Sequence, residues 1–243
     1  TPFYAEAFRQ PSAVFVSELG IPRTDLLFGP DRDARAASVR ERYAIPRDRR
    51  VVLYAPTFRG DRIVDARADS LLDFEALAAV VGEDHVVLAR LHPFVRSRLD
   101  IPEWLRGFVV DASGAPELNE LMLASDVLVT DYSSAVFEFA LLDRPIAIFA
   151  PDLDAYERER DLYLDIRTEL PAPVLETPDA VAAWLRSGAA DMERVQAFAT
   201  RWFTVADGHA TERFVDRVVE PALRGEKVTA ADLRERAPSP PSG

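Results

Sequence analysis

The chain has 243 residues, of which 48% are hydrophobic, contains no cysteine and carries a formal net charge of −12. This length suits one large domain or one and a half ordinary ones, and the hydrophobic content is enough to fill a core. The acidic balance argues against a nucleic-acid partner, which would need a basic face. A small phosphate ligand remains open, because a few local Arg and His residues are enough to bind one.

The composition also limits the chemistry and the compartment. Without cysteine there is no thiolate metal site and no thiol nucleophile, and a reducing compartment fits. The sequence has neither a signal peptide nor an apolar run of the roughly 18 residues that a membrane span needs. We therefore expect a cytoplasmic protein, and peripheral attachment to the inner face of the cell membrane stays open. Because the chain starts with Thr1 rather than Met, we also expect a domain of something longer.

Apolar runs and helical spacing predict the main elements. Expected helices are 3–8, 32–43, 71–81, 117–124, 136–142, 178–185, 192–203 and a last one ending near 223. Expected strands are 13–16, 51–55, 85–93, 108–111, 127–130 and 145–150. Because apolar strands alternate with helices, we predict an α/β fold with a doubly wound, Rossmann-like parallel sheet. Neither GxGxxG nor a P-loop occurs.

We expect two regions. Residues 1–225 should form a nucleotide-binding α/β lobe, and residues 226–243 a disordered tail, because the chain ends in a low-complexity stretch rich in Pro and Ser. Residues 61–70 are polar and expected to be loop. The charged segment 153–170 is more typical of a solvated helix than of a site.

The first polar segment of interest is Gly20-Ile21-Pro22-Arg23-Thr24-Asp25. Pro22 restricts the backbone to a turn or extended geometry, which holds Arg23 at a fixed position on a loop. A solvated cation is the plainer interpretation of Arg23, and contact with a phosphate is the alternative.

The expected strand at 51–55 ends in Pro56-Thr57-Phe58-Arg59. Ligands of open α/β sheets bind just past the C-terminal ends of the strands. Thr57 and Arg59 are therefore candidates to contact phosphate through a hydroxyl and a guanidinium group.

The expected strand at 85–93 contains two histidines. His85 begins it, and we expect a surface residue there. His92 lies at its C-terminal end, before Pro93, and a structural role and a role in chemistry are both open for it.

The stretch from Val127 to Ala140 runs from a buried strand through the turn Asp131-Tyr132-Ser133-Ser134 into a helix. Such a turn can bind phosphate through free backbone N–H groups and the helix dipole, and Ser133 and Ser134 add two hydroxyls. Simple N-capping is the alternative. No Glu or Gln follows either serine by three residues, so we expect the first-turn N–H groups to lack a side-chain partner. Asp131 is a further candidate, although we expect it mainly to orient the turn, because a carboxylate repels a diphosphate.

Near the end, Asp207-Gly208 predicts a turn before the last helix. Thr211 and Arg213 follow it. Their side chains can cap that helix or lie on its surface, or they can contact a ligand.

Several of these segments together resemble one family. They are Gly20 to Asp25, Leu53-Tyr54-Ala55-Pro56-Thr57-Phe58-Arg59, Leu91-His92-Pro93, Leu128 to Ser134, the Pro145 strand with Asp152 to Tyr156, and Asp207 to Arg213. Over roughly residues 1–223 the chain resembles the CDP-glycerol glycerophosphotransferase family, the teichoic acid polymerases and primases of bacterial envelopes. The departures are Arg160 followed by Asp161 where the family usually has Arg-Gly, and Ala172 where it has Gly.

The resemblance implies the C-terminal, nucleotide-binding lobe of a glycosyltransferase-B-like fold. It implies transfer of a polyol phosphate, first of all glycerol phosphate, from a CDP-activated donor to a hydroxyl of a polymer acceptor, with release of CMP. The family's other lobe, whose Trp-His-Gly segment carries the general base, has no match here, so we do not expect this chain to turn over alone. The implied partners are a CDP-polyol, the polymer acceptor and that lobe, and no metal or cofactor is implied.

Site roles follow from the resemblance together with the pattern. Ser133 and Ser134 would bind the diphosphate, and Arg59 and His92 would neutralise charge as catalytic residues. Two alternatives are open: a lobe that uses a UDP- or GDP-sugar, and a nucleotide-binding module without catalysis. The second-rank phosphate contacts are Arg23, Thr57, Thr211 and Arg213.

Overall fold

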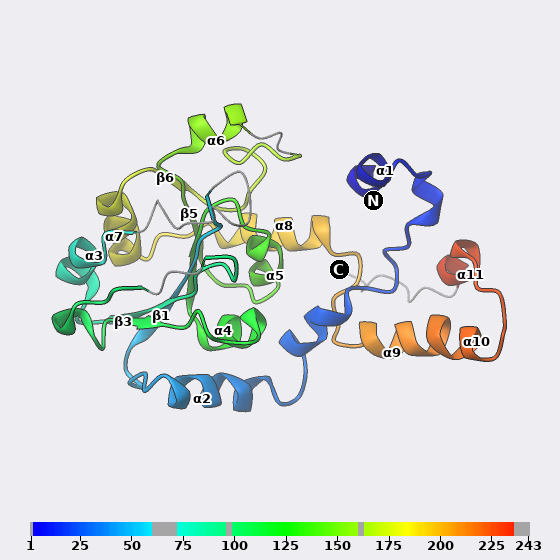
Figure 1. The fold of residues 1–243 in the computed structure, drawn as a ribbon, viewed down its shortest axis with the longest axis horizontal. Helices are drawn as coiled ribbons and strands as arrows, with labels where there is room; N and C mark the ends of the chain where they lie inside the picture. Colours follow the sequence, from blue (N-terminus) through cyan, green and yellow to red (C-terminus); the bar gives the residue numbers. More distant parts are fainter. Residues whose placement is uncertain (1, 60–71, 96–98, 160–162, 236–243) are drawn as a thin grey trace. The chain divides into compact units, whose positions relative to one another are not determined.

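The computed structural model describes residues 2–59, 72–95, 99–159 and 163–235 (Figure 1). By their contacts the residues form two compact units, residues 1–32 with 199–243 (unit 1) and residues 33–198 (unit 2). We expected a single lobe over 1–225. The division differs because the first 32 residues contact the C-terminal segment.

Unit 2 is built on one sheet. Its strands are β1 (Arg50–Ala55), β2 (His85–Ala89), β3 (Val109–Asp111), β4 (Val127–Thr130), β5 (Ile146–Phe149) and β6 (Val174–Leu175). They lie in the order β3-β2-β1-β4-β5-β6, and every pairing is parallel. The predicted doubly wound α/β fold is confirmed. The strand order reverses between β1 and β4, which makes their C-terminal ends the switch point of the sheet.

The register of β1 and β4 fixes which residues meet at that switch point. Ala55 pairs with Thr130, the last residues of the two strands. The Thr130 hydroxyl donates a hydrogen bond of 2.6 Å to the Ala55 carbonyl oxygen. Both strands are buried on both faces, as their apolar sequences predict. The two segments that follow therefore leave the sheet side by side.

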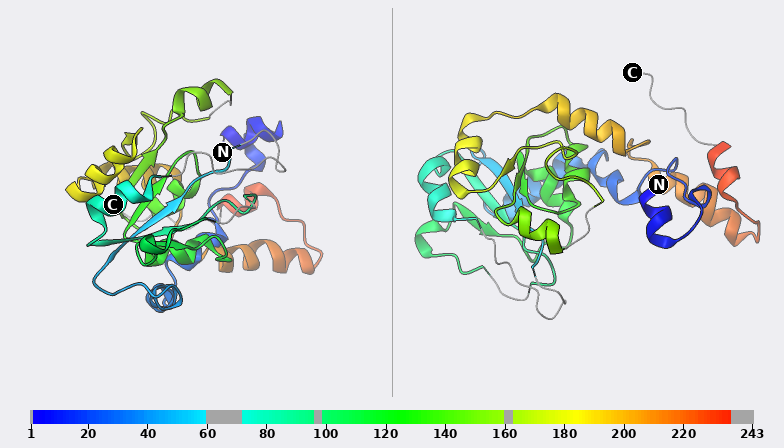
Figure 2. Two further views of the ribbon diagram at one scale, coloured as in Figure 1. Left: turned by 60° about the vertical axis from the view of Figure 1, so that its left-hand side comes forward. Right: turned by 90° about the horizontal axis from the view of Figure 1, so that it is seen from above.

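Helices cover both faces of the sheet (Figure 2). The helices of this part of the chain are α2 (Arg32–Arg42), α3 (Phe74–Val81), α4 (Leu118–Ala124), α5 (Ala135–Ala140), α6 (Leu153–Glu159), α7 (Pro178–Ser187) and α8 (Met192–Trp202). Helices α3 and α7 pack together on one face, where Leu77 and Val181 join the core with Val52 and Val129. Helices α4 and α5 contact the sheet at β1 and β4.

Local sequence explains where two of these helices begin. The Asp73 side chain accepts a hydrogen bond from the Ala76 amide at the start of α3. Thr177 does the same for the Ala180 amide at the start of α7, and Pro178 occupies the first turn. The predicted cap at Thr177 is confirmed.

Unit 1 contains short helical segments. They are α1 (Pro2–Phe8), the 3-10 helices Ser12–Val14 and Pro22–Leu27, α9 (Ala210–Phe214), a π-helical stretch (Val215–Val219), α10 (Glu220–Leu223) and α11 (Ala230–Glu235). Asp25 links the two halves of the unit, because its carboxylate accepts from the amides of Ala210 and Thr211, at 2.9 and 2.7 Å. Among the described residues no helix is long and apolar enough to cross a membrane.

Four expectations about elements differ from the structure. The strand predicted at 13–16 is wrong: the segment is a 3-10 turn in which Val14 is exposed, so its apolar residues line no sheet. The two-residue strand β6 was not predicted, because so short a run has no periodicity. Part of the expected disordered tail forms α11, whose Arg234 donates to the carbonyl oxygens of Ala13 and Phe15. Residues 61–70 and the departure at Arg160 lie outside the described residues.

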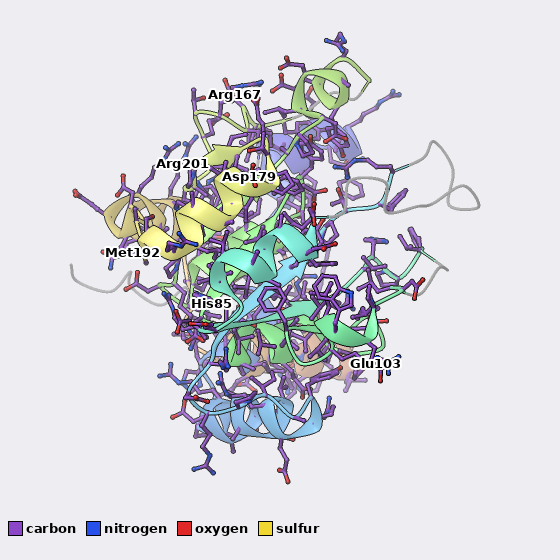
Figure 3. All side chains as sticks on the ribbon, turned by 90° about the vertical axis from the view of Figure 1, so that its left-hand side faces the viewer. His85, Glu103, Arg167, Asp179, Met192 and Arg201 are labelled. Atoms are coloured by element: carbon purple, nitrogen blue, oxygen red, sulfur yellow. The ribbon has the colours of Figure 1, made fainter. Side chains whose placement is uncertain are left out.

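The fourth difference concerns His85 (Figure 3). We expected a surface residue, but the side chain is buried and only 5% exposed. Its position at the first residue of a central strand explains this, because His85 pairs with Arg50 of β1 and every residue of β2 is buried.

Candidate functional site

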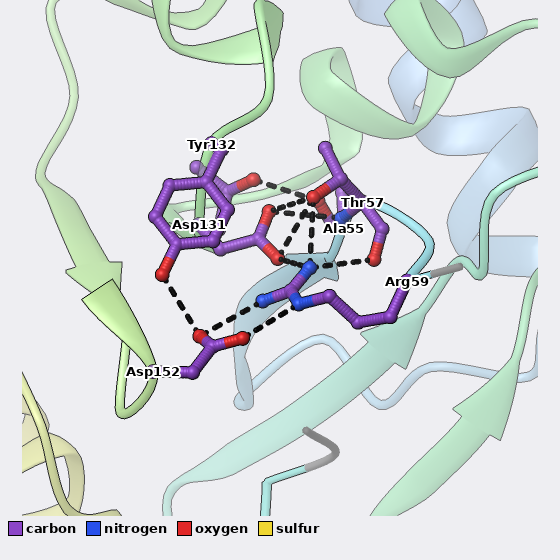
Figure 4. Close-up of polar contacts among 7 residues, drawn as sticks. Ala55, Thr57, Arg59, Asp131, Tyr132 and Asp152 are labelled. Carbon is purple, nitrogen blue, oxygen red and sulfur yellow. Dashed lines mark hydrogen bonds and ion pairs between the residues drawn. The ribbon is translucent and has the colours of Figure 1, made fainter. Parts of the chain in front are cut away.

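The switch point of the sheet carries a compact cluster of polar and aromatic side chains (Figure 4). Thr57 and Arg59 follow β1, Asp131 and Tyr132 follow β4, and Asp152 follows β5. Ligands of open parallel sheets bind in the crevice beyond this edge. The structure therefore brings three of the sequence candidates, Thr57, Arg59 and Asp131, to the expected place, and adds two residues.

Asp131 is the buried centre of the cluster, with 3% of its surface exposed. One carboxylate oxygen accepts from the Thr57 amide at 2.8 Å, and both accept from the Thr57 hydroxyl at 3.0 Å. The other oxygen pairs with Arg59 Nη1 at 2.8 Å. Burial raises the pKa of Asp131, while Arg59 and the Thr57 donors act in the opposite direction. These bonds hold the ends of β1 and β4 together, as the expected orienting role requires.

Arg59 spans two carboxylates. Its Nε and Nη2 atoms donate to the two oxygens of Asp152, at 2.8 and 3.2 Å, and Nη1 donates to Asp131 and to the Thr57 carbonyl and hydroxyl oxygens. Burial disfavours the charged form, but the hydrogen bonds to Asp152 and Asp131 outweigh it and raise the pKa of Arg59. The guanidinium is therefore a permanently charged link between the ends of three strands.

Tyr132 and Asp152 complete the cluster, and the sequence interpretation assigned them no role. The Tyr132 hydroxyl donates a 2.8 Å hydrogen bond to Asp152, and its ring stacks on Tyr156 of α6 with centroids 3.6 Å apart. The guanidinium of Arg59 lies 4.9 Å from the Tyr132 ring centroid, within cation–π range. Asp152 comes shortly after the end of β5, behind Ala150 and Pro151. This place past the end of a buried strand is the signal that could have identified it.

The pKa values of these two residues follow from the same contacts. Burial opposes ionisation of Asp152, but hydrogen bonds from Arg59 and Tyr132 outweigh it and lower the pKa of Asp152. Burial raises the pKa of Tyr132, and its bond to Asp152 raises it further. At neutral pH the Tyr132 phenol is therefore neutral, whereas its neighbours Asp152 and Arg59 are charged.

The serine turn lies next to this cluster, at the start of α5. Ser134 is exposed and its side chain caps no amide. The expectation that all first-turn N–H groups lack a side-chain partner is wrong for Ala135, whose amide donates to the Ser133 hydroxyl oxygen at 3.2 Å. The next two amides, of Val136 and Phe137, donate to the carbonyl oxygens of the two serines. The two serines thus accept hydrogen bonds from the first amides of α5, which the sequence pattern did not predict.

His92 lies beyond the end of β2, at the same edge of the sheet, and its side chain is half-buried. Its ring packs against Phe58 and Phe94, with centroids 4.9 and 4.7 Å away. Burial lowers the pKa of His92, and the nearby charge of Arg90 lowers it further. A cationic His92 that neutralises charge, as expected from the sequence, is therefore disfavoured at neutral pH.

Three candidates belong to unit 1. Arg213 is buried, and it donates through Nη1 and Nη2 to Asp207, both at 2.8 Å, and through Nε to the Leu19 carbonyl oxygen at 2.9 Å. The hydrogen bond with Asp207 raises the pKa of Arg213 and lowers that of Asp207. Thr211 is exposed, and its amide is held by Asp25, whereas Arg23 is exposed on the 3-10 helix. These contacts give Arg213 a structural role.

The described part of the chain contains no group of three or more His, Asp or Glu side chains placed to hold a metal ion. The positive charge near the switch point comes from arginine.

The sequence and the fold of the chain were compared with those of known proteins. The sequence profile of one family, CDP-Glycerol:Poly(glycerophosphate) glycerophosphotransferase, matches residues 1–220. The chain belongs to this family.

Two sequence relatives illustrate the range of the glycerophosphotransferase family. The chain is 38% identical over 223 residues to a teichoic acid poly(ribitol-phosphate) polymerase of Bacillus spizizenii, which covers 90% of the chain and 35% of the relative. It is 34% identical over 183 residues to a teichoic acid poly(glycerol phosphate) polymerase of Bacillus subtilis, covering 74% of the chain and 24% of the relative. The family resemblance inferred from the motifs is confirmed.

Solved structures lead to the same family. The wall teichoic acid polymerase TagF aligns with 85% of this chain and 52% of its own, at 31% identity and a TM-score of 0.73. A TagF H444N variant soaked with CDPG gives 30% identity over 85% of this chain and 52% of its own, with the same TM-score. The chain thus spans about a third of the Bacillus spizizenii polymerase and about half of the solved TagF chain.

Proposed function

We propose that this chain binds the activated donor in a polyol-phosphate transferase. The enzyme would move glycerol phosphate or a related polyol phosphate from a CDP-polyol to a hydroxyl of a polymer acceptor and release CMP. The products would be teichoic-acid-like or capsule polymers. The proposal is supported chiefly by one observation: the family's shared segments after β1, β2, β4 and β5 all lie at the switch-point edge of the sheet.

The reaction would be a phosphoryl transfer. The acceptor oxygen forms a bond to the β-phosphorus, and the bond from that phosphorus to the bridging oxygen breaks. CMP leaves with the electron pair, and the proton of the acceptor hydroxyl passes to a base. Because the leaving phosphate gains charge, a well-placed hydrogen-bond donor to it contributes about 3–4 kcal/mol.

We assign the diphosphate to the serine turn and its surroundings. Ser134 offers an exposed hydroxyl, and Ser133 stands beside it at the positive end of α5. Arg59 would act by fixing this edge and by its charge, since two carboxylates hold its side chain. Thr57 and Asp131 would support the turn.

The general base and the acceptor site would come from outside these 243 residues. The chain covers only part of the length of its relatives, and the family's Trp-His-Gly segment has no match in it. We also propose a peripheral position at the inner face of the cell membrane, where an envelope polymer would be built.

Isothermal titration calorimetry on this chain tests the proposal. CDP-glycerol, CDP-ribitol, CMP, UDP and GDP would be titrated under identical conditions. We expect the cytidine nucleotides to bind at least about tenfold more tightly than UDP and GDP, equal to about 1.4 kcal/mol. A preference for UDP or GDP would contradict the proposal and indicate a sugar transferase lobe. Ser134→Ala should weaken CDP-glycerol binding, whereas Ser187→Ala, at the far end of α7, should not.

A further inference from the structure

Tyr132, the residue directly before the serine turn, is held by contacts at both its hydroxyl group and its ring (Figure 4). The hydroxyl donates a 2.8 Å hydrogen bond to Asp152. The ring stacks on Tyr156 with an interplanar angle of 13°, and the guanidinium of Arg59 lies 4.9 Å from its centroid. Because Ser133 is the next residue, these contacts also restrict where the serine turn begins.

Two of the three partners come from the first turn of one helix. Asp152 directly precedes α6 and Tyr156 lies four residues later, and residues four apart lie on the same face of a helix. The backbone carbonyl oxygen of Asp152 accepts the amide of Tyr156 at 2.9 Å, which closes this turn. Leu153, between them, is 2% exposed and anchors the turn in the core. Asp152, Tyr132 and Tyr156 thus form a connected set, which we call the tyrosine clamp.

The serine turn itself is only weakly held by its own hydrogen bonds. The Ala135 amide donates to the Ser133 hydroxyl at 3.2 Å, and the Val136 amide donates to the Ser133 carbonyl oxygen at 3.4 Å. Both distances are longer than the about 2.9–3.0 Å typical of an N–H donor and an oxygen. Ser134 is exposed, and its side chain caps no amide. The conformation of the turn therefore depends on how firmly the residues before it are held.

We propose that Asp152 and Tyr156 are positioning residues for the donor: through Tyr132 they hold the serine turn in the conformation that binds the diphosphate. This inference rests on the proposed function and adds two residues that do not touch the ligand. A ligand that meets a turn already in place pays less conformational entropy on binding. Loosening the tyrosine clamp should therefore weaken binding even though both serines remain.

Tyr156 is the better residue to change, because Asp152 also binds Arg59. A stacked aromatic pair contributes an amount equal to about 2- to 10-fold in an equilibrium constant. We expect Tyr156→Leu to weaken CDP-glycerol binding by about 3- to 10-fold and Tyr156→Phe, which keeps the ring, to stay within about 1.5-fold of the wild type. Calorimetry at pH 7 is the measurement. Trp104→Leu, which removes an exposed ring before β3, is the control and should change nothing.

A double variant tests whether Tyr156 acts through Tyr132. If it does, the two losses do not add, and Tyr132→Leu/Tyr156→Leu should bind CDP-glycerol within about twofold of Tyr132→Leu alone. Additive losses would mean that Tyr156 affects the ligand by another route, and the inference would be wrong. Tyr132→Phe is the milder variant, because it keeps the stack and removes only the bond to Asp152. We expect it to weaken binding by about 3- to 10-fold.

Hydrogen exchange followed by NMR reports on the turn without a ligand. The amide of Ala135 should exchange about 3- to 10-fold faster in Tyr156→Leu than in the wild type, because the turn opens more often. The matched control is the amide of Ala180, which donates to the Thr177 side chain at the start of α7 and should not change.

The two kinds of failure can be told apart. If the wild-type chain binds CDP-glycerol and a folded Tyr156→Leu chain binds it equally well, the positioning role is wrong whatever the exchange rates show. If the wild-type chain does not bind CDP-glycerol, the proposed function is wrong. The role in diphosphate binding then falls with it, even where faster exchange at Ala135 shows that the tyrosine clamp holds the turn.

Discussion

At the scale of single residues, Arg59 decides how the site edge is held. It joins segments that follow three different strands, through a buried carboxylate, Asp131, and a half-buried one, Asp152. The Arg59 side chain is 12% exposed and the Asp131 side chain 4%. A buried ion pair is weak evidence for net stability, but removing one partner leaves the other charge without compensation.

We therefore expect Arg59→Gln to lower the free energy of unfolding by about 3–5 kcal/mol, because Asp131 would remain buried without its cation. Urea denaturation at pH 7 measures this. Arg167→Gln is the matched control: Arg167 also binds two carboxylates, Asp154 and Glu157, but at the surface, so its loss should change little. Equal effects of the two substitutions would show that the Arg59 pair contributes no more than a surface one.

His85 supplies a prediction about pH. Its ring is buried at the start of β2. Burial, helped by Arg50, lowers the pKa of His85, while the backbone of Val81 and the carboxylates of Asp84 and Asp126 act in the opposite direction. The folded chain therefore binds this proton less readily than the unfolded chain, whose histidine pKa is about 6.5. The stability that this difference provides is present above pH 6.5 and is lost as the pH falls below it.

We expect the unfolding free energy of the wild type to fall below pH 6.5 with a slope of up to about 1.4 kcal/mol per pH unit from this residue. His85→Leu should remove that part of the loss, because leucine has no proton to bind. Urea denaturation at pH 7.5, 6.5 and 5.5 gives the comparison. His209→Leu, at an exposed site, should keep the wild-type acid sensitivity, and a His85→Leu variant that keeps it too would contradict the argument.

At the scale of elements, the turn before α9 depends on one glycine. Gly208 has φ +84°, a backbone conformation that glycine adopts without cost, and a Cβ atom there would lie 2.9 Å from Cβ of Phe28. The expected Asp207-Gly208 turn is thus both left-handed and in close contact with the segment after the first 3-10 helices. Its conformation positions Asp207 to bind Arg213.

Gly208→Ala should therefore destabilise unit 1 by about 1–3 kcal/mol through backbone strain and contact with Phe28. Gly114→Ala is the control, because a Cβ there meets nothing within 4 Å and its φ is not positive. Thermal unfolding followed by circular dichroism compares the two. A Gly208→Ala chain as stable as Gly114→Ala would mean that the turn can change its conformation at no cost.

At the scale of the whole molecule, the chain covers only part of the length of its relatives. The described residues supply a switch-point edge with arginine, histidine and serine, and they align with about half of the TagF chain. Nucleotide binding and turnover should therefore separate. Under the proposed function, this chain would bind the CDP-polyol through its own contacts, whereas transfer would also require the acceptor and a base.

We expect the isolated chain to bind CDP-glycerol without transferring glycerol phosphate, and a protein that also contains the remaining part of the family's length to do both. Release of CMP with a polyol acceptor, followed by chromatography, measures transfer. A nucleotide-binding module without catalysis would leave the longer protein inactive as well. Turnover by the isolated chain would show instead that these 243 residues already contain the base.

The amino-acid sequence alone determined the fold class, the parallel sheet and the family. Apolar runs at β1, β2, β4 and β5 are strong signals because these strands are buried on both faces, so that every residue in them is selected for burial. The segments after them were placed correctly at one edge for the same reason, since parallel strands end together. Two short segments were interpreted wrongly. The apolar run at 13–16 was predicted to be a strand but pairs with none, and β6, with its two residues, is too short to show a periodicity.

Only the tertiary structure decided what the side chains at that edge do. Arg59 pairs with Asp131, which lies 72 positions later in the sequence, and with Asp152, which lies 93 positions later. A local sequence pattern cannot predict a contact between residues so far apart in the chain. The burial of His85 and the contact of His92 with Phe58 likewise depend on neighbours that folding brings close. Periodicity records which face of an element is buried, whereas the partner of a charge, and with it the pKa and the role of each group, is set by contacts between segments far apart in the chain.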